Sequence, residues 1–179
     1  EMENGKPQGK GILVLYDKNG RIISKYTGNF IAGEPEGDGK FIVYDKDGKV
    51  QSEYTGSFKN GKFNGKGVHV SYDSNGKITA KYEGLFKNGE RHGEGTFSEF
   101  DENGILRSKY IGEYKAGKRH GQGSFFQYDE RGILAKKYLG TFDEDKISGE
   151  GVLFVYDSDG KLATKYLGQV VDGIPEGEG

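Results

Sequence analysis

The chain repeats itself every 28 residues, and this period limits its fold more than any other feature. A tyrosine recurs at this spacing without gap or insertion, and a glycine follows two residues after each one. The tyrosines are Tyr26, Tyr54, Tyr82, Tyr110, Tyr138 and Tyr166. A fixed period in this range is typical of repeat architectures, in which each unit packs mainly on its neighbours. We therefore expect an array of similar units rather than one large globular core.

Two turn signals divide each unit. The first is Tyr-Asp-x-x-Gly, as in residues 72–76, where aspartate bonds backbone amides and glycine accepts a positive φ. This pattern predicts a type I turn with a glycine bulge between antiparallel strands. The second is a hairpin dipeptide such as Asn60-Gly61, with equivalents at Ala32-Gly33, Asn88-Gly89, Ala116-Gly117 and Asp172-Gly173. Glu144 and Asp145 lack the glycine, so we expect a different turn type there.

Alternating residues between the turns predict strands, and no useful length has a helical period. The fold class is therefore all-β: a single-layer antiparallel β-meander solenoid of about six two-stranded repeats, with about twelve strands. We expect one repeat domain over residues 1–179, made of a partial unit 1–16, full units 17–44, 45–72, 73–100, 101–128 and 129–156, and a partial unit 157–179. Because both ends match the middle of a unit, we expect a fragment of a longer chain.

Glycine and aromatic side chains have complementary roles in this pattern. Glycine supplies 32 of the 179 residues, about 18%, against a usual value of ~7%. A Gly-x-Gly pair such as Gly65 and Gly67 recurs in every unit and leaves room for a ring to lie over the backbone. A bulge near the turn leaves open whether Tyr44 and Tyr54 share a face, because one extra residue reverses the answer.

The pattern Tyr-x-Gly-x-Phe-x-x-Gly-x-x-x-Gly-x-Gly, in residues 54–67 and 82–95, closely resembles the MORN (membrane occupation and recognition nexus) repeat. The resemblance covers essentially the whole chain, although the units are longer than ordinary MORN units. This longer form also resembles the variant repeats of bacterial antitoxin-like proteins. Tryptophan, which the family often uses, is absent. The resemblance implies a single-layer curved sheet with roles in scaffolding, dimerisation and attachment to membranes or the cytoskeleton. It implies no chemistry.

The residues give no candidate for catalysis, a metal or a cofactor. Cysteine is absent, and no serine has a plausible histidine and aspartate partner. His92 and His120 occupy equal positions two strands apart, ~10 Å, which is too far to share a metal, and His69 lies elsewhere. The aspartate turns reverse the chain too soon to form a calcium loop. A net charge of −2 does not favour nucleic acid. We expect a protein that is not an enzyme, binds no cofactor and is cytoplasmic.

Two sets of side chains are candidate contact surfaces. The first is an aromatic stripe that a single-layer sheet would leave uncovered: Tyr26, Phe30, Tyr54, Phe58, Tyr82, Phe86, Tyr110, Tyr114, Tyr138, Phe142 and Tyr166. Large exposed apolar patches usually mark interaction sites. We expect a protein partner, a flanking helix or a second copy to cover the stripe or the sheet edge. The second set is a lysine ridge on the opposite face, formed by Lys25, Lys81, Lys109, Lys137 and Lys165, with Glu53 as the exception.

Three functional hypotheses follow. The first is a non-catalytic scaffold that presents its aromatic-lined sheet to a protein. The second is a module that attaches to an anionic membrane through the lysine ridge, since each lysine near such a surface contributes ~1 kcal/mol. A solvated face kept soluble by lysine explains the same ridge. The third is a regulatory domain of an enzyme outside this sequence. The first two place the chain at a cytoskeletal structure or a membrane.

Overall fold

The computed structural model describes residues 2–171 and 174–176, and it divides the chain into two compact units, Glu1–Glu90 and Arg91–Gly179. The first unit contains β1 (Met2–Glu3), β2 (Lys6–Pro7), β3 (Gly9–Tyr16), β4 (Ile22–Ile31), β5 (Glu34–Tyr44), β6 (Val50–Lys59), β7 (Lys62–Tyr72) and β8 (Ile78–Lys87). The second contains β9 (Glu90–Phe100), β10 (Leu106–Lys115), β11 (Lys118–Tyr128), β12 (Leu134–Asp143), β13 (Lys146–Tyr156), β14 (Leu162–Val171) and β15 (Ile174–Glu176).

Each unit is an antiparallel meander in which the order of hydrogen-bonded strands follows the order of the chain. The short strands β1 and β2 pair only with each other. The twelve long strands β3–β14 match the number expected from two strands per repeat. No helix occurs among the described residues, so each unit is a single layer of strands. The expected all-β single-layer meander is confirmed.

The aspartate turns, which join the two strands of each repeat, have the geometry that the sequence predicts. In the first of them, the Gly20 amide donates to the Asp17 carbonyl at 3.0 Å, and Gly20 has a φ of 80°. The Asp17 carboxylate also accepts hydrogen bonds from the backbone amides of Asn19 and Arg21, at 2.8 and 2.9 Å. A type I turn followed by a glycine in the left-handed region is the glycine-bulge hairpin.

The second hairpins, which connect one repeat to the next, turn on two residues that both have positive φ. Asn60 and Gly61 have φ values of 50° and 73°, as a type I′ turn requires. Glu144 and Asp145 were expected to differ, and that expectation is wrong, because their φ values are 45° and 72°. The equivalent pair Asp172-Gly173 lies outside the described residues.

Contacts with the preceding repeat hold Glu144 and Asp145 in this conformation without a glycine. The Asp145 amide donates to the Arg119 carbonyl at 3.0 Å, as Gly117 does to Arg91 one repeat earlier. In addition, the Asp145 carboxylate accepts the Arg119 amide at 2.9 Å, and the Arg119 guanidinium donates to the Asp145 carbonyl at 2.6 Å. Aspartate tolerates the left-handed region better than most residues, and these bonds offset the remaining strain.

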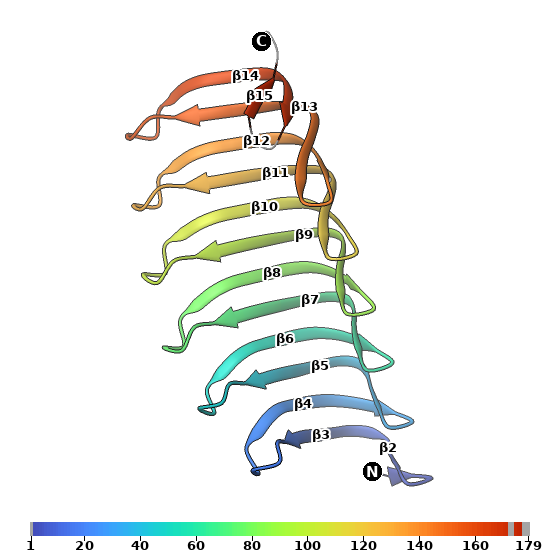
Figure 1. Cartoon of the computed structure of the whole chain (residues 1–179). Coiled ribbons are helices and arrows are strands. Elements are labelled where there is room, and N and C mark those ends of the chain that lie inside the picture. The colour runs from blue at the N-terminus through green and yellow to red at the C-terminus, as the bar shows by residue number, and fades with distance from the viewer. Residues whose placement is uncertain (1, 172–173, 177–179) are drawn as a thin grey trace. The chain divides into compact units, whose positions relative to one another are not determined.

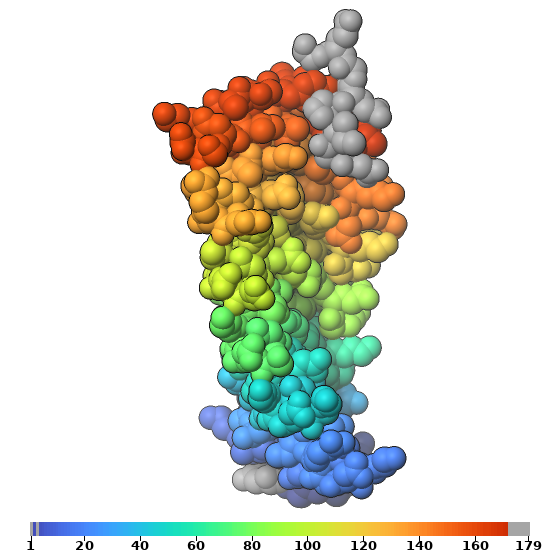
Figure 2. Space-filling view, turned by 60° about the vertical axis from the view of Figure 1, so that its left-hand side comes forward, coloured from blue at the N-terminus to red at the C-terminus, as the bar shows by residue number. Residues whose placement is uncertain are grey.

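The strands bend where they run into the second hairpins. Between β6 and β7 the register shifts between Gly56 and Phe58, and the same irregularity recurs between Gly112 and Tyr114. In Figure 1 the strands cross the view and turn sharply toward the second hairpins on the right-hand side. Within each unit the side chains of successive repeats form successive bands (Figure 2). The second hairpin of each repeat is thereby folded back toward one face of its own sheet.

Strand pairing defines the two faces of the sheet. Tyr54 lies opposite Phe41 and His69, and this tyrosine face holds the core. Glu53 lies opposite Ile42 and Val70 on the other side, which we call the lysine face. The Tyr72 hydroxyl donates to the Glu53 carboxylate, so the tyrosine before each aspartate turn belongs to the lysine face. Tyr72 therefore lies on the face opposite to Tyr54, and Tyr44, which holds the same position one repeat earlier, is expected to do the same.

Candidate functional site

The repeated tyrosines lie flat against glycine backbone. A Cβ added to Gly67 would come within 2.3 Å of the Tyr54 hydroxyl oxygen, and one added to Gly56 within 2.7 Å of the same atom. The Tyr54 hydroxyl donates to the Ser57 carbonyl at 2.9 Å, which satisfies its one polar group. Tyr110 has the same relation to Gly112 and Gly123, with Cβ approaches of 2.6 and 2.5 Å. The expected use of glycine as space for rings is confirmed at these positions.

Three core tyrosines also join their own repeat to the next one, since the rings of Tyr26, Tyr54 and Tyr110 each meet a phenylalanine of the following repeat. The Tyr54 ring meets Phe58 of its own repeat edge-on at 5.2 Å and Phe86 of the next repeat at 5.1 Å. Phe63, from the second hairpin, stacks on the Tyr54 ring at 3.8 Å with only 9° between the planes. Aromatic pairs in such geometry contribute about 0.5–1.5 kcal/mol beyond the area they bury. The ring therefore has glycine backbone on one side and the folded-back hairpin on the other.

This packing corrects the expectation that nothing in the chain covers the aromatic stripe. Tyr166 is half-buried, and the other ten residues of the stripe are buried, at 0–7% exposure. The buried ten are Tyr26, Phe30, Tyr54, Phe58, Tyr82, Phe86, Tyr110, Tyr114, Tyr138 and Phe142. Residues of the second hairpins contribute to this cover, as Phe63 does over Tyr54 and Arg119 over Tyr110. Contact with a partner through these residues stays a prediction, but their burial leaves the accessible surface to other side chains.

The sequence contains a signal for this cover at one further repeated position. Pro35, Phe63, Arg91, Arg119 and Ile147 occupy the same place in successive repeats, two residues before the first glycine of each Gly-x-Gly pair. In the second unit the Arg119 guanidinium lies 5.7 Å from the centre of the Tyr110 ring and 5.3 Å from that of Phe142. An arginine can take the place of the stacked Phe63 because its planar guanidinium also packs on rings.

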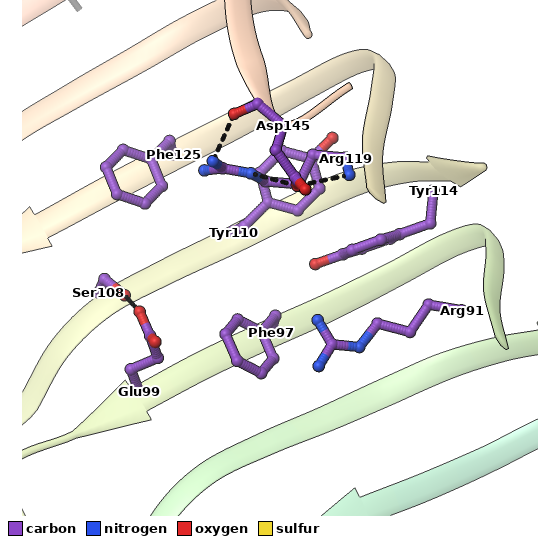
Figure 3. Close-up of a pocket in the computed structure, with 9 residues that line it drawn as sticks. All are labelled: Arg91, Phe97, Glu99, Ser108, Tyr110, Tyr114, Arg119, Phe125 and Asp145. Carbon is purple, nitrogen blue, oxygen red and sulfur yellow. Dashed lines mark hydrogen bonds and ion pairs between the residues drawn. The ribbon is translucent and has the colours of Figure 1, made fainter. Parts of the chain in front are cut away.

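A hollow of about 290 Å³ opens on the tyrosine face of the second unit (Figure 3). Phe97, Phe125 and Tyr114 form its apolar walls, and Arg91 and Arg119 enter from the second hairpins. The Arg91 guanidinium lies 4.3 Å from the Phe97 ring centre. Arg119 bonds to Asp145 as described above, and Ser108 and Glu99 hydrogen-bond to each other at 2.5 Å.

The polar groups of the hollow contact its rings and one another. Ser108 donates a hydrogen bond to Glu99, and no histidine lines the hollow, so it does not contain the serine–histidine pair of a catalytic triad. In the described part of the chain, no group of three or more His, Asp or Glu side chains is placed to hold a metal ion. None of these residues forms a helix long and apolar enough to cross a membrane.

Burial raises the pKa of two of the core tyrosines. The pKa of Tyr54 rises to about 12, chiefly because burial disfavours its charged form, and Asp38 acts in the same direction. Burial likewise raises the pKa of Tyr110 to about 12, against an opposing effect of Arg119. Both phenols are therefore neutral hydrogen-bond donors over the physiological range. They support the structure and are poorly suited to proton transfer near neutral pH.

The five ridge lysines lie on the lysine face, opposite to the core tyrosines, as the alternation predicts. Neighbouring lysines of the second unit are not adjacent, because one residue of the intervening strand separates them. In the second unit the cross-strand row reads Ser98, Lys109, Phe126, Lys137, Phe154 and Lys165. The Lys137 ammonium lies 5.6 Å from the Phe126 ring centre and 5.5 Å from that of Phe154. Lysine and phenylalanine thus alternate in contact.

The same row has a different electrostatic character in the first unit. There Glu53 stands in place of a lysine and pairs with Lys40 at 2.9 Å, while Lys81 pairs with Glu83 at 3.1 Å. The Lys40 ammonium, with the Tyr72 hydroxyl, holds the pKa of Glu53 below its usual value. Among the residues that the structure describes, no ion pair joins Lys109, Lys137 or Lys165 to a carboxylate. Within the described residues, the second unit is thus the one in which no carboxylate interrupts the row of lysines.

An apolar row runs beside these lysines on the same face. It consists of Ile111, Leu139, Val152 and Leu167, which face one another through Ser124 across β10–β14. Ile111 is 40% exposed and Leu167 is 68% exposed, while Leu139 and Val152 are half-buried. The second unit therefore presents a positive row and an apolar row side by side, and no second layer covers them in the described structure.

Comparison with known families agrees with this architecture. The MORN repeat model matches residues 1–20, 26–47, 54–76, 82–98, 110–129, 138–155 and 166–179, which together make up well over half of the chain. A MORN repeat variant model matches residues 37–60 and 93–116. A comparison with curated proteins found no match. The repeat period, the single-layer meander and these matches lead to one assignment: the chain belongs to the MORN repeat family.

Proposed function

We propose that the chain is a non-catalytic protein-binding module that contacts its partner through the lysine face of the second unit. Repeats of this family usually form modules of protein or membrane interaction, and the family is generally non-catalytic. The observation that carries the proposal is the contrast between the two faces. The tyrosine face is covered by its own hairpins, whereas the lysine face leaves Ile111 and Leu167 exposed beside a row of lysines.

Apolar side chains beside alternating positive charges combine two features of protein interfaces. Burial of the apolar row on association supplies most of the favourable free energy, at about 25 cal/mol per Å² of apolar area. The lysines contribute orientation and selectivity, because charged groups at an interface mainly steer encounter and exclude wrong partners. A single-layer sheet is held rigid by its core, so it loses little conformational entropy when a partner binds.

The test compares two double variants as affinity baits. Ile111→Asp with Leu167→Asp disrupts the apolar row, whereas Leu162→Asp with Val171→Asp changes two other exposed apolar residues, at 54% and 42% exposure. We expect quantitative mass spectrometry to identify a protein retained by the wild type and by the Leu162 and Val171 control. The same protein should be lost from the Ile111 and Leu167 variant. Equal retention by all three baits would refute the proposed surface.

Attachment to an anionic membrane is the second candidate function, and the same row favours it. Lysines near an anionic surface each contribute ~1 kcal/mol of attraction, which weakens with salt. We expect the attraction to appear as flotation with phosphatidylserine vesicles at low salt, reduced at physiological salt. Replacement of Lys109, Lys137 and Lys165 by glutamate should abolish it. Absence of flotation at both salt concentrations would remove this candidate and leave the protein-binding proposal.

A further inference from the structure

We infer that the lysine face of the second unit binds an amphipathic α-helix with acidic residues at heptad spacing, lying across the strands. This inference rests on the proposed function and names the kind of partner. The first step is the spacing of the lysines. Lys109, Lys137 and Lys165 lie on β10, β12 and β14, so neighbouring lysines are two strands apart. At 4.7–4.9 Å per strand, this is about 9.6 Å.

Seven residues of α-helix rise about 10.5 Å, close to the separation of neighbouring lysines. Acidic residues at i, i+7 and i+14 therefore span about 21 Å, against about 19 Å for the three lysines. The difference of about 2 Å is within the reach of the flexible lysine side chains. The helix residues at i+3 and i+10 then lie over Phe126 and Phe154, which occupy the intervening strands. The pattern Glu-x-x-Leu-x-x-x-Glu-x-x-Leu-x-x-x-Glu fits the row.

An extended peptide does not fit in the same way. With its rise of about 3.3 Å per residue, the acidic residues opposite neighbouring lysines would be three positions apart. Side chains of an extended chain alternate between two sides, so an odd spacing turns every second acidic residue away from the protein. A helix keeps its i, i+7 and i+14 residues on one side. The two-strand spacing of the lysines, which corresponds to three residues of an extended peptide, thus favours a helix over a strand laid across the sheet.

The lysines of the row are partly positioned before an anionic partner arrives. The Lys137 ammonium is held between two phenyl rings, and the Lys165 ammonium lies 5.8 Å from the Phe154 ring centre. These contacts limit the positions of the lysines before binding, which reduces the entropy lost when a carboxylate arrives. The adjacent apolar row, with Ile111 and Leu167 exposed, receives the apolar side of the same helix. The first unit has no equivalent series of lysines, because Glu53 stands in its row.

Fluorescence anisotropy with a designed probe tests the inference. The probe is a fluorescein-labelled, alanine-based helical peptide of about three heptads that carries the glutamate and leucine pattern above. A control peptide has the same composition, with its glutamates five residues apart. We expect saturable binding of the probe and at least tenfold weaker binding of the control, since a five-residue spacing turns the acidic residues around the helix. Equal binding of the two peptides would overturn the heptad inference.

Charge reversal in the protein gives an independent test. Lys109→Glu, Lys137→Glu and Lys165→Glu together should weaken probe binding by about a hundredfold, because three attractive contacts become repulsive. A peptide with lysine in place of each glutamate should bind this variant and not the wild type. The matched control, Lys115→Glu, Lys136→Glu and Lys146→Glu, alters three exposed lysines outside the row and should bind the probe normally. Circular dichroism and thermal unfolding verify that each variant is folded.

The outcomes separate this inference from the proposed function. If the probe does not bind, but a protein is still retained through the apolar row in the affinity experiment, the helix inference fails and the proposed function stands. If phosphatidylserine vesicles bind and the probe does not, the row is a membrane contact and the helix inference fails as well. If the probe binds and the charge-inverted peptide rescues the triple variant, the lysine row recognises an acidic helix.

Discussion

Gly67 shows how one missing Cβ controls the packing of a ring. The Tyr54 ring occupies the volume that any larger residue at position 67 would need, with its hydroxyl, Cε2 and Cζ atoms all within 2.5 Å of the added Cβ. The ring is also fixed from above by Phe63. Neither partner can move away without breaking a strand or a stacked pair, so the glycine is required for steric reasons. Gly67 has no unusual φ, and conformational freedom plays no part here.

Gly67→Ala is therefore predicted to lower the free energy of unfolding more than the same substitution at a glycine whose only special feature is a positive φ. Gly48 has a φ of 78° and open space around it, so Gly48→Ala should cost about 1–2 kcal/mol from left-handed strain. Overpacking usually costs about 1–3 kcal/mol, and the rigid surroundings of Gly67 put its substitution at or above the upper end. Urea unfolding of both variants measures the difference. A Gly67→Ala variant no less stable than Gly48→Ala would contradict the packing described for Tyr54.

The role of these glycines was predictable from the sequence, but the burial of the tyrosines was not. The spacing of Tyr54, Gly56 and Gly67 indicates a ring over the backbone, because no other residue type leaves that space. It does not show what lies on the other side of the ring. Phe63 reaches it only because the chain bends between Gly56 and Phe58. A bulge is a local irregularity of pairing, and alternation alone cannot give its direction.

At the scale of elements, the second hairpins decide which face of the sheet is covered. The four second hairpins at residues 32–33, 60–61, 88–89 and 116–117 have glycine at the second turn position. The hairpin at Glu144 and Asp145 keeps the same conformation without glycine. The hydrogen bond from the turn amide to the preceding repeat is common to all of them. Turn type was therefore mispredicted because the sequence rule considers the turn alone. Here the conformation is imposed from the neighbouring repeat, with Arg119 adding bonds to Asp145.

Substitutions at Asp145 separate the stabilising effect of its carboxylate hydrogen bonds from the cost of its left-handed backbone conformation. Asp145→Ala keeps the left-handed strain and loses the carboxylate bonds, so we expect a loss of about 1–3 kcal/mol in the free energy of unfolding. Asp145→Gly loses the same bonds but removes the strain, and should be about 1 kcal/mol more stable than Asp145→Ala. Chemical denaturation of both variants gives the values. If the alanine and glycine variants are equally stable, the neighbouring repeat does not hold the turn in a strained conformation.

At the scale of the whole molecule, the buried tyrosines link stability to alkaline pH. The pKa of a tyrosine in an unfolded chain is about 10, whereas the pKa values of Tyr54 and Tyr110 in the folded protein are about 12. Between these values the unfolded state loses its protons first. The folded state then binds more protons than the unfolded state, so stability decreases as pH rises.

We accordingly predict that the stability contributed by these phenols is complete below pH ~10 and is lost as the pH rises toward ~12. Urea midpoints measured from pH 9 to 11.5, with tyrosinate absorbance recorded in parallel, follow both processes. Tyr54→Phe should be less stable near pH 7 by about 0.5–1.5 kcal/mol, since it loses the hydrogen bond to Ser57. It should also show a shallower alkaline decline. An unchanged slope in this variant would show that Tyr54 is not the group that titrates.

The ring over the glycine pair also fixes how many residues can separate the tyrosine from its glycines. If one residue is inserted between Tyr54 and Gly67, the side chain of Lys66 enters the space under the ring, and every following side chain changes face. The aspartate turns carry no such constraint, because no ring lies over Gly48 or Gly76. The length of the array is therefore quantised. It can grow or shrink in whole steps of 28 residues, and smaller changes are tolerated only where the chain turns in solvent.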